Sequence, residues 1–281
     1  MATQLVPLPN VTRLSPLCIR ILGGNPGKFT LQGTNTYLLG SGKRRILIDT
    51  GEGKPAWADS LRSVLCDENA TIETVLISHW HHDHVGGIRD LQSIAEGAVI
   101  YKNEPQEGQS AILDGQVFSV EGVTLTAHYT PGHTADHMVF TLVEEDAMFT
   151  ADNVLGQGTA VFEDLATYMQ SLDNMKRLFH GKAYPGHGPL IENGPLKITE
   201  YIEHRKQREE QVIHVMRDME QDGRNTWSAM DIVKVVYRDV SEDLHPAACS
   251  GVLQILHKLQ AEKKVVQSED SKWRLEGKPA L

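Results

Sequence analysis

The sequence of 281 residues contains little cysteine. Its three cysteines, Cys18, Cys66 and Cys249, lie far apart, are odd in number and form no CxxC pair. This pattern argues against a disulfide framework and against a zinc site built from thiolates, and it favours a reducing compartment.

Long apolar runs are also missing. Although 40% of the residues are hydrophobic, which is enough for a sizeable core, no stretch approaches the roughly 18 apolar residues that span a bilayer. We therefore predict no membrane partner. A chain of this length is expected to form one large domain with an appendage, or two domains.

Acidic residues are absent before Asp49, whereas that segment holds six basic residues. A basic, acid-poor start is typical of a mitochondrial address, but prolines at positions 7, 9 and 16 interrupt any amphipathic helix there. The residues alone leave cytosol and mitochondrial matrix equally open. The net charge of −10 counts against a dedicated nucleic-acid binder, although charges beyond about 10 Å are screened at physiological salt.

A dense group of metal-binding residue types occupies positions 79–84, HWHHDH. Four of these residues are candidate donors: His79, His81, Asp83 and His84. The preceding run 73–78 is apolar and β-branched like a buried strand, and the following run 85–94 has helical spacing. A strand that leads through a ligand loop to a helix presents side chains at the carboxyl edge of a sheet. Such donors suit zinc or another divalent ion of intermediate softness.

Three further donors stand at predicted strand ends. His133 lies in the turn YTPGHT, Asp152 ends FTAD, and His187 lies in PGHG. Seven donors exceed the needs of one tetrahedral ion, so we predict two sites that share Asp152 as a bridge. The first site comprises His79, His81 and His133, and the second comprises Asp83, His84 and His187.

The order of predicted elements favours two sheets flanked by helices. A composition shift follows, because 198–223 is a long charged helix that Gly223 ends. Predicted helices at 228–238 and 246–262 and a hairpin at 264–275 are compatible with a winged-helix module. We therefore expect domains at 1–222 and 223–281.

These motifs, HWHHDH, TPGHTADH, Asp152 and PGHG, resemble the metallo-β-lactamase superfamily over about residues 15–195. The segments 31–40, 161–169 and 184–189 give a narrower resemblance to the β-lactamase-like protein 2 family of mitochondrial endoribonucleases. The resemblance implies an α+β fold, a four-layer αβ/βα sandwich with a small C-terminal winged-helix-like domain. It also implies the mitochondrial matrix, with the cytoplasm as the alternative.

The predicted activity follows from the ions and from this resemblance. Two Zn²⁺ per chain, or other divalent ions, would share a water and lower its pKa towards neutrality. The resemblance implies a metal-dependent endoribonuclease whose metal-bridged hydroxide cleaves phosphodiester bonds in single-stranded RNA, with Asp83 and Asp152 as catalytic residues. We expect 5′-phosphate and 3′-hydroxyl products, because the attack needs no 2′-hydroxyl.

Other residues are assigned weaker roles. Asp49 is predicted to support a metal-bound imidazole, with a surface carboxylate as the alternative, and His137 either supports the metal or makes a structural hydrogen bond. The resemblance alone suggests that Asn35 faces the substrate, whereas a turn-shaping Asn explains it equally well. Lysines near the last helix and hairpin could bind RNA beside Trp273, unless Trp273 is packed in the core. These are Lys258, Lys263, Lys264 and Lys272.

Several rival functions share this site. A thioester hydrolase resembling glyoxalase II uses the same seven donors and is the main alternative. A one-iron persulfide dioxygenase, a diiron redox protein and a silent RNA-binding scaffold are disfavoured by the complete donor set with His81. The fold and the metal site do not choose the substrate, and the oligomeric state is not predicted.

Overall fold

The computed structural model describes residues 5–221 and 226–276 of the chain. The chain divides into two units: the first runs up to Phe162 and includes Thr167–Thr199, and the second comprises Glu163–Ala166 and the residues from Glu200 onward. The expected domain boundary at 222/223, with its helix end at Gly223, lies outside the described residues and stays a prediction.

The first unit contains a seven-stranded sheet with strands in chain order. The strands are β1 (Val11–Arg13), β2 (Cys18–Leu22), β3 (Asn35–Leu39), β4 (Arg44–Ile48), β5 (Thr71–Ile77), β6 (Val99–Lys102) and β7 (Ser110–Ala111). Strands β1 to β4 are antiparallel, as the predicted meander requires, and β4 to β7 are parallel. Parallel pairing needs crossover connections, and the helical segments after β4 and β5 provide them.

A second sheet has five strands in the order β12-β11-β10-β9-β8. They are β8 (Val117–Val120), β9 (Val123–Tyr129), β10 (Met138–Leu142), β11 (Ala147–Ala151) and β12 (Ala183–Pro185). Only the β11–β12 pair is parallel among them. The short strands β1 and β7 were not expected from the sequence, because three and two residues carry too little periodicity.

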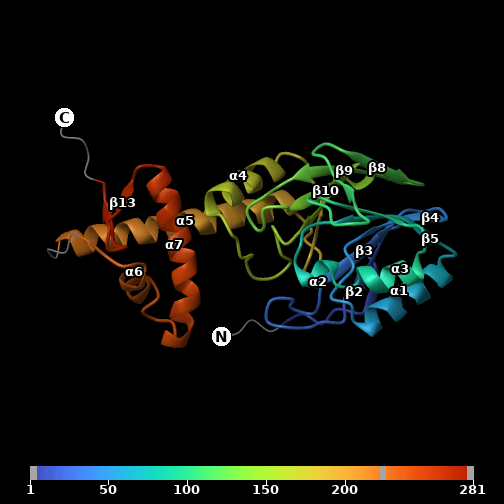
Figure 1. The fold of residues 1–281 in the computed structure, drawn as a ribbon, viewed down its shortest axis with the longest axis horizontal. Helices are drawn as coiled ribbons and strands as arrows, with labels where there is room; N and C mark the ends of the chain where they lie inside the picture. Colours follow the sequence, from blue (N-terminus) through green and yellow to red (C-terminus); the bar gives the residue numbers. More distant parts are fainter. Residues whose placement is uncertain (1–4, 222–225, 277–281) are drawn as a thin grey trace. The chain divides into compact units, whose positions relative to one another are not determined.

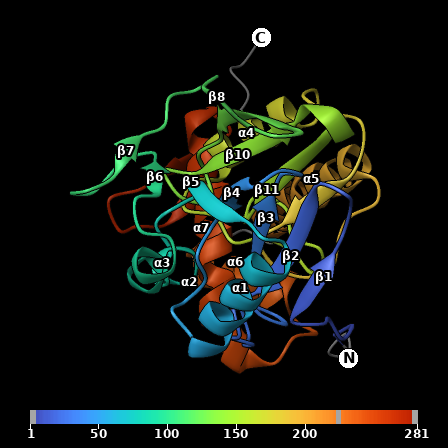
Figure 2. The ribbon, with the colours of Figure 1, turned by 90° about the vertical axis from the view of Figure 1, so that its right-hand side faces the viewer.

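The two sheets pack face to face around an apolar core, which includes Tyr37, Ile48, Phe140 and Phe149. Helices α1 (Pro55–Asp67) and α3 (Ile88–Ile94) cover the outer face of the first sheet, where Trp57 and Leu61 are fully buried. Helix α4 (Leu165–Met175) lies over the second sheet, as the layers in Figure 1 show. Figure 2 shows α1 and α3 beside the strands of the first sheet. The predicted αβ/βα sandwich is confirmed.

The second unit is mainly helical. It contains most of α5 (Gly194–Gln221), then α6 (Ala229–Val236), α7 (His245–Ala261) and the ribbon β13 (Val265–Gln267) with β14 (Trp273–Leu275). Ser228 and Asp231 form a capping box that begins α6, and Trp227 and Trp273 pair through their backbones with both rings buried. These elements agree with the expected winged-helix module. None of the helices in the described part of the chain combines the length and the apolar character that a membrane span requires.

Candidate metal centre

The seven predicted donors come from loops and turns at one edge of the two sheets. Strand β5 leads into His79, and α2 (His82–Val85) carries Asp83 and His84. The β9–β10 connection supplies His133, and the remaining two donors follow β11 and β12. The sequence predicted a loop at 79–84, but its second half is one helical turn. The structure therefore brings together donors that lie more than 100 positions apart in the chain.

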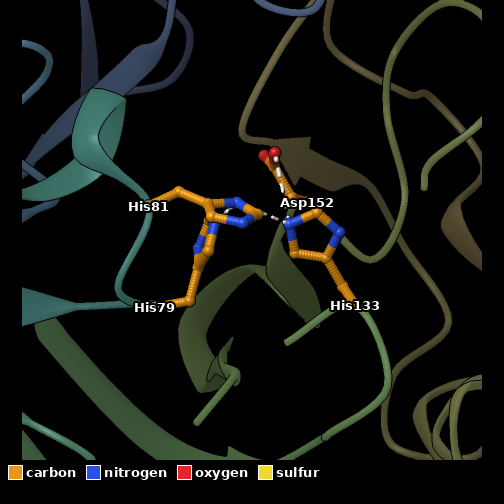
Figure 3. Close-up of side chains that lie close together, drawn as sticks. All are labelled: His79, His81, His133 and Asp152. Atoms are coloured by element: carbon orange, nitrogen blue, oxygen red, sulfur yellow. Dashed lines mark hydrogen bonds and ion pairs between the residues drawn. The ribbon is translucent and has the colours of Figure 1, made fainter. Parts of the chain in front are cut away.

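Four of the donors form the first cluster, which Figure 3 shows in close-up. The Nδ1 atom of His81 lies 3.0 Å from Nε2 of His79 and 3.1 Å from Nε2 of His133. The carboxylate of Asp152 lies 3.7 Å from Nε2 of His133. Nδ1 of His81 carries at most one hydrogen. It therefore cannot donate to Nε2 of His79 and to Nε2 of His133 at the same time. Three imidazole nitrogens and one carboxylate facing a common point fit a divalent cation.

The second cluster comprises Asp83, His84 and His187. Oδ2 of Asp83 lies 3.2 Å from Nε2 of His187 and 3.4 Å from Nε2 of His84. Asp152 connects the clusters, since its Oδ2 lies 3.2 Å from His187 and its Oδ1 lies 3.4 Å from His84. Both Nε2 of His84 and Oδ1 of Asp152 are buried without a hydrogen-bond partner. Unpaired buried polar atoms need an explanation, and a second cation would satisfy both.

Hydrogen bonds on the far side of three imidazoles fix which nitrogen faces the clusters. Nδ1 of His84 donates to Asp49 (2.7 Å), Nδ1 of His133 donates to the carbonyl of Val161 (2.8 Å), and Nδ1 of His79 donates to Ser78 Oγ (2.9 Å). The direction at Ser78 follows because its own hydroxyl donates to Asp49. In each ring Nε2 is therefore the nitrogen that faces the clusters, and it can bind a metal when the imidazole is neutral.

Asp49 lies where the sequence placed it, behind a metal-site imidazole. It accepts hydrogen bonds from His84 and from both the backbone nitrogen (2.8 Å) and the hydroxyl (2.7 Å) of Ser78. Sequence reasoning missed Ser78. The sequence pattern that could have revealed it is a short polar residue between an apolar strand and the first histidine. A polar side chain buried at such a position needs a hydrogen-bond partner.

His137 and Asn35 both lie close to the donors. Nδ1 of His137 hydrogen-bonds Thr130 Oγ1 (3.1 Å), and its ring packs 5.2 Å from that of His79, so both alternatives for this residue stay predictions. Nδ2 of Asn35 donates to the carbonyls of Pro185 (2.8 Å) and Gly188 (2.9 Å). Asn35 is fully buried and holds the turn that carries His187, so it does not face a substrate.

The clusters strongly perturb the pKa values of their members. Burial opposes the charge of Asp83, but His84 and His187 outweigh it and hold the pKa of this carboxyl well below its usual range. Burial also opposes protonation of His187, yet the neighbouring Asp152 and Asp83 raise its pKa to about 9. The pKa of His79 is lowered by burial and by His84. Perturbed groups of this kind are concentrated at functional sites.

The four lysines predicted to bind RNA do not form an open basic surface. Lys258 pairs with Glu209 (2.6 Å) and Glu262 (2.5 Å), and Lys264 pairs with the same two carboxylates. Lys272 pairs with Asp270 (2.8 Å), while Lys263 stands at a positive φ of 58° after α7. The ring of Trp273 is fully buried, so the base-stacking interpretation is wrong and the core alternative is correct.

A cleft of about 420 Å³ opens onto both clusters. His81, Asp83, His133, Asp152 and His187 border it from the metal side, together with His82. Its remaining walls come from residues 28–31 and 155–161. Sequence reasoning gave no role to either wall, because exposed loop residues carry no periodic signal.

Comparisons with known proteins agree with the fold. The family model described as "Metallo-beta-lactamase superfamily" matches residues 29–107 and 100–187, and "Beta-lactamase associated winged helix domain" matches residues 228–273. A solved metallo-beta-lactamase family protein of Thermus thermophilus superposes with a TM-score of 0.74, covering 94% of this chain and 100% of that one at 20% identity. A beta-lactamase domain protein of Burkholderia ambifaria gives a TM-score of 0.80, covering 94% and 93% at 16% identity.

Two fungal proteins are similar over nearly the whole chain. An "atrochrysone carboxyl ACP thioesterase" of Aspergillus chevalieri is 46% identical over 98% of this chain and 92% of its own length. The "lactamase-like protein nscB" of Arthroderma gypseum is 46% identical over 92% of this chain and 86% of its own length.

These relatives correct the predicted endoribonuclease activity and the predicted single-stranded RNA partner, which are wrong. The relative that aligns nearly end to end is named as a thioesterase. The narrower resemblance led to a wrong activity because its motifs belong to the candidate metal site and the turns around it. Neither feature determines the substrate. The compartment stays a prediction.

Proposed function

The chain belongs to the metallo-beta-lactamase superfamily, and we propose that it hydrolyses the thioester between an acyl group and an acyl carrier protein. The observation that carries this proposal is the 46% identity, over 98% of the chain, to a protein named as an acyl carrier protein thioesterase. Thioester hydrolysis was also the main alternative that the sequence left open.

We further infer that the two donor clusters hold two zinc ions. Three imidazole nitrogens with Asp152 form one set, and two imidazoles with Asp83 form the other. Mixed nitrogen and oxygen donors of this kind suit zinc. When bound, the ions would supply an activated water and polarise the thioester carbonyl.

The side chains of the chain itself orient these reactants. Asp83 borders the cleft as a carboxylate at neutral pH, so it can accept a hydrogen bond from the attacking water. Hydrolysis adds the water oxygen to the acyl carbon, breaks the carbon–sulfur bond and yields a carboxylic acid and a thiol. A thiol of pKa about 8.5 leaves readily as the thiolate near neutral pH. The reaction therefore needs no strong proton donor. The imidazoles of the two clusters could not act as one while they bind the metal ions.

The test uses the full chain loaded with zinc and an acylated carrier protein. We expect the carrier's mass to fall by the acyl group with release of one free thiol, and we expect both signals to disappear with a chelator. Asp152→Asn should reduce the rate by at least about a hundredfold, because it removes the shared anionic donor. An acyl-glutathione arm separates this function from a glyoxalase II-like one. An unchanged carrier with zinc fully bound contradicts the proposal.

A further inference from the structure

The two walls of the cleft are each connected by hydrogen bonds to the metal clusters. The first wall is formed by Lys28 to Leu31, and the second wall by residues 155–161. The second wall bonds cluster residues directly, whereas the first is connected through Asn25 and Thr34. Loops usually vary in position, so these connections point to a defined spacing between the walls.

The first wall is held by two buried polar residues. The hydroxyl of Thr34 donates to Oδ2 of Asp83 (2.9 Å), and Nδ2 of Asn25 donates to that same hydroxyl oxygen (3.0 Å). The backbone carbonyl of Asn25 in turn accepts from Thr30 Oγ1 (2.6 Å), inside the wall itself. A short chain of hydrogen bonds therefore runs from Asp83 to the residue beside Phe29.

The second wall is held from two sides. The carbonyl of Val161 accepts from Nδ1 of His133 (2.8 Å), and the backbone nitrogen of Gly156 donates to the carbonyl of His187 (2.9 Å). Displacing this loop would cost His133 the contact that fixes its tautomer. The position of the second wall is therefore coupled to that of His133 and His187.

Each wall exposes a large apolar side chain at the cleft. Phe29 is 71% exposed and Val161 is 58% exposed, and both line the same cavity of about 420 Å³. A cavity of this size lies in the range of ligand pockets, which are lined mainly by apolar groups. Apolar side chains on anchored loops gain free energy only when a ligand or partner covers them.

We propose that Phe29 and Val161 are specificity-determining residues that hold a bulky, apolar acyl group while its thioester carbonyl faces the metal clusters. This inference rests on the proposed thioesterase function. An acetyl-sized group would leave both side chains in water, whereas a bulky apolar acyl group would bury them.

The experiment compares the 2-naphthoyl and acetyl thioesters of N-acetylcysteamine on the zinc-loaded full chain. Phe29→Ala and Val161→Ala should each lower kcat/KM for the naphthoyl thioester about tenfold or more, and for the acetyl thioester less than about twofold. Phe29→Leu should recover part of the loss. The matched control is Leu113→Ala, because Leu113 is 69% exposed and does not line the cleft.

A binding measurement without turnover keeps the two proposals separate. Calorimetric titration with 2-naphthoate should show binding that Phe29→Ala weakens about tenfold and Leu113→Ala leaves unchanged. If naphthoate binds in this way but no thioester is hydrolysed, the acyl pocket stands and the thioesterase function fails. Equal losses for both thioesters, or naphthoate binding that ignores Phe29, overturn the inference.

Discussion

Nδ1 of His84 donates a 2.7 Å hydrogen bond to Oδ2 of Asp49, and both side chains are almost completely buried. Asp49 directly follows β4, and His84 lies in α2, which follows the neighbouring strand β5. The bond leaves Nε2 of His84 facing Asp83 and Asp152. A carboxylate that holds an imidazole in this way fixes its tautomer and raises its basicity as a ligand.

Asp49→Asn should weaken metal binding by about ten- to a hundredfold at the second cluster. The single amide oxygen of Asn can replace only one of the two carboxylate oxygens. Either the backbone nitrogen of Ser78 loses its acceptor, or both the Ser78 hydroxyl and Nδ1 of His84 lose theirs. Bound zinc is measured by mass spectrometry after dialysis against graded chelator. Asp59→Asn serves as the control, since this carboxylate is exposed on α1. Two full equivalents retained by Asp49→Asn would show that Asp49 has no such role.

Thr34→Val should reduce kcat more than it raises KM, because Asp83 loses the hydroxyl that orients its Oδ2. We expect a loss of about tenfold, as for removal of one hydrogen bond to a charged group. Thr34→Ser keeps the hydroxyl and should restore most of kcat. The second readout is zinc affinity at the Asp83 cluster, measured by chelator competition. If serine and valine behave alike in both measurements, the hydroxyl is not what positions Asp83.

Metal binding should release protons at pH 7. In the metal-free protein, nearby carboxylates raise the pKa of His187 to about 9 and that of His84 well above its usual value, although burial opposes both shifts. Both imidazoles are therefore charged near neutrality and must lose a proton to bind a metal. Zinc affinity should rise with pH until about 9, where His187 is already half deprotonated.

Calorimetric zinc titrations in two buffers of different ionisation enthalpy measure this release directly. We expect close to one proton from each of the two histidines at pH 7, and a smaller number above pH 9. His187→Gln should remove about one of the two released protons. A zinc-binding enthalpy that is the same in both buffers would contradict the assignment.

The structure brings the seven predicted donors into two clusters, and the sequence could single them out because their chemistry is local; their metal binding stays a prediction. Four donor types within six residues, and three more beside Pro-Gly turns or at strand ends, are costly to bury without a shared ligand. The same reasoning found Asp49. It could not find Ser78 or Thr34, because a hydroxyl becomes informative only when its partner across the fold is known.

The substrate could not be predicted from the sequence, for a different reason. The groups that we propose to contact it, Phe29 and Val161, are exposed side chains on loops whose spacing follows no periodicity. The lysines near the C-terminus suggested a nucleic-acid surface because their charges were counted without their partners. Glu209, Glu262 and Asp270 pair with three of them, and only Glu209 is distant in the chain.

Lys102 and Asp136 form a buried ion pair that ties the end of β6 to the loop carrying His133. Nζ of Lys102 also donates to the carbonyl of Asn103 (2.7 Å), and the other oxygen of Asp136 accepts from Thr134 Oγ1 (2.8 Å). Lys102→Met should lower the free energy of unfolding by about 3–5 kcal/mol, because it leaves Asp136 as a buried, unpaired charge.

Replacing both partners should cost much less than replacing one. In the Lys102→Met, Asp136→Leu double variant no charge is left unpaired, and exchange of a buried pair for apolar groups is often nearly neutral. Urea unfolding of the metal-free chain followed by circular dichroism gives the four free energies of a double-mutant cycle. Lys182→Met is the control, because its pair with Glu192 is exposed and should contribute less than about 1 kcal/mol. Additive losses in the double variant would mean that the two charges do not stabilise one another, and that the loop of His133 is held by its backbone and by Thr134 instead.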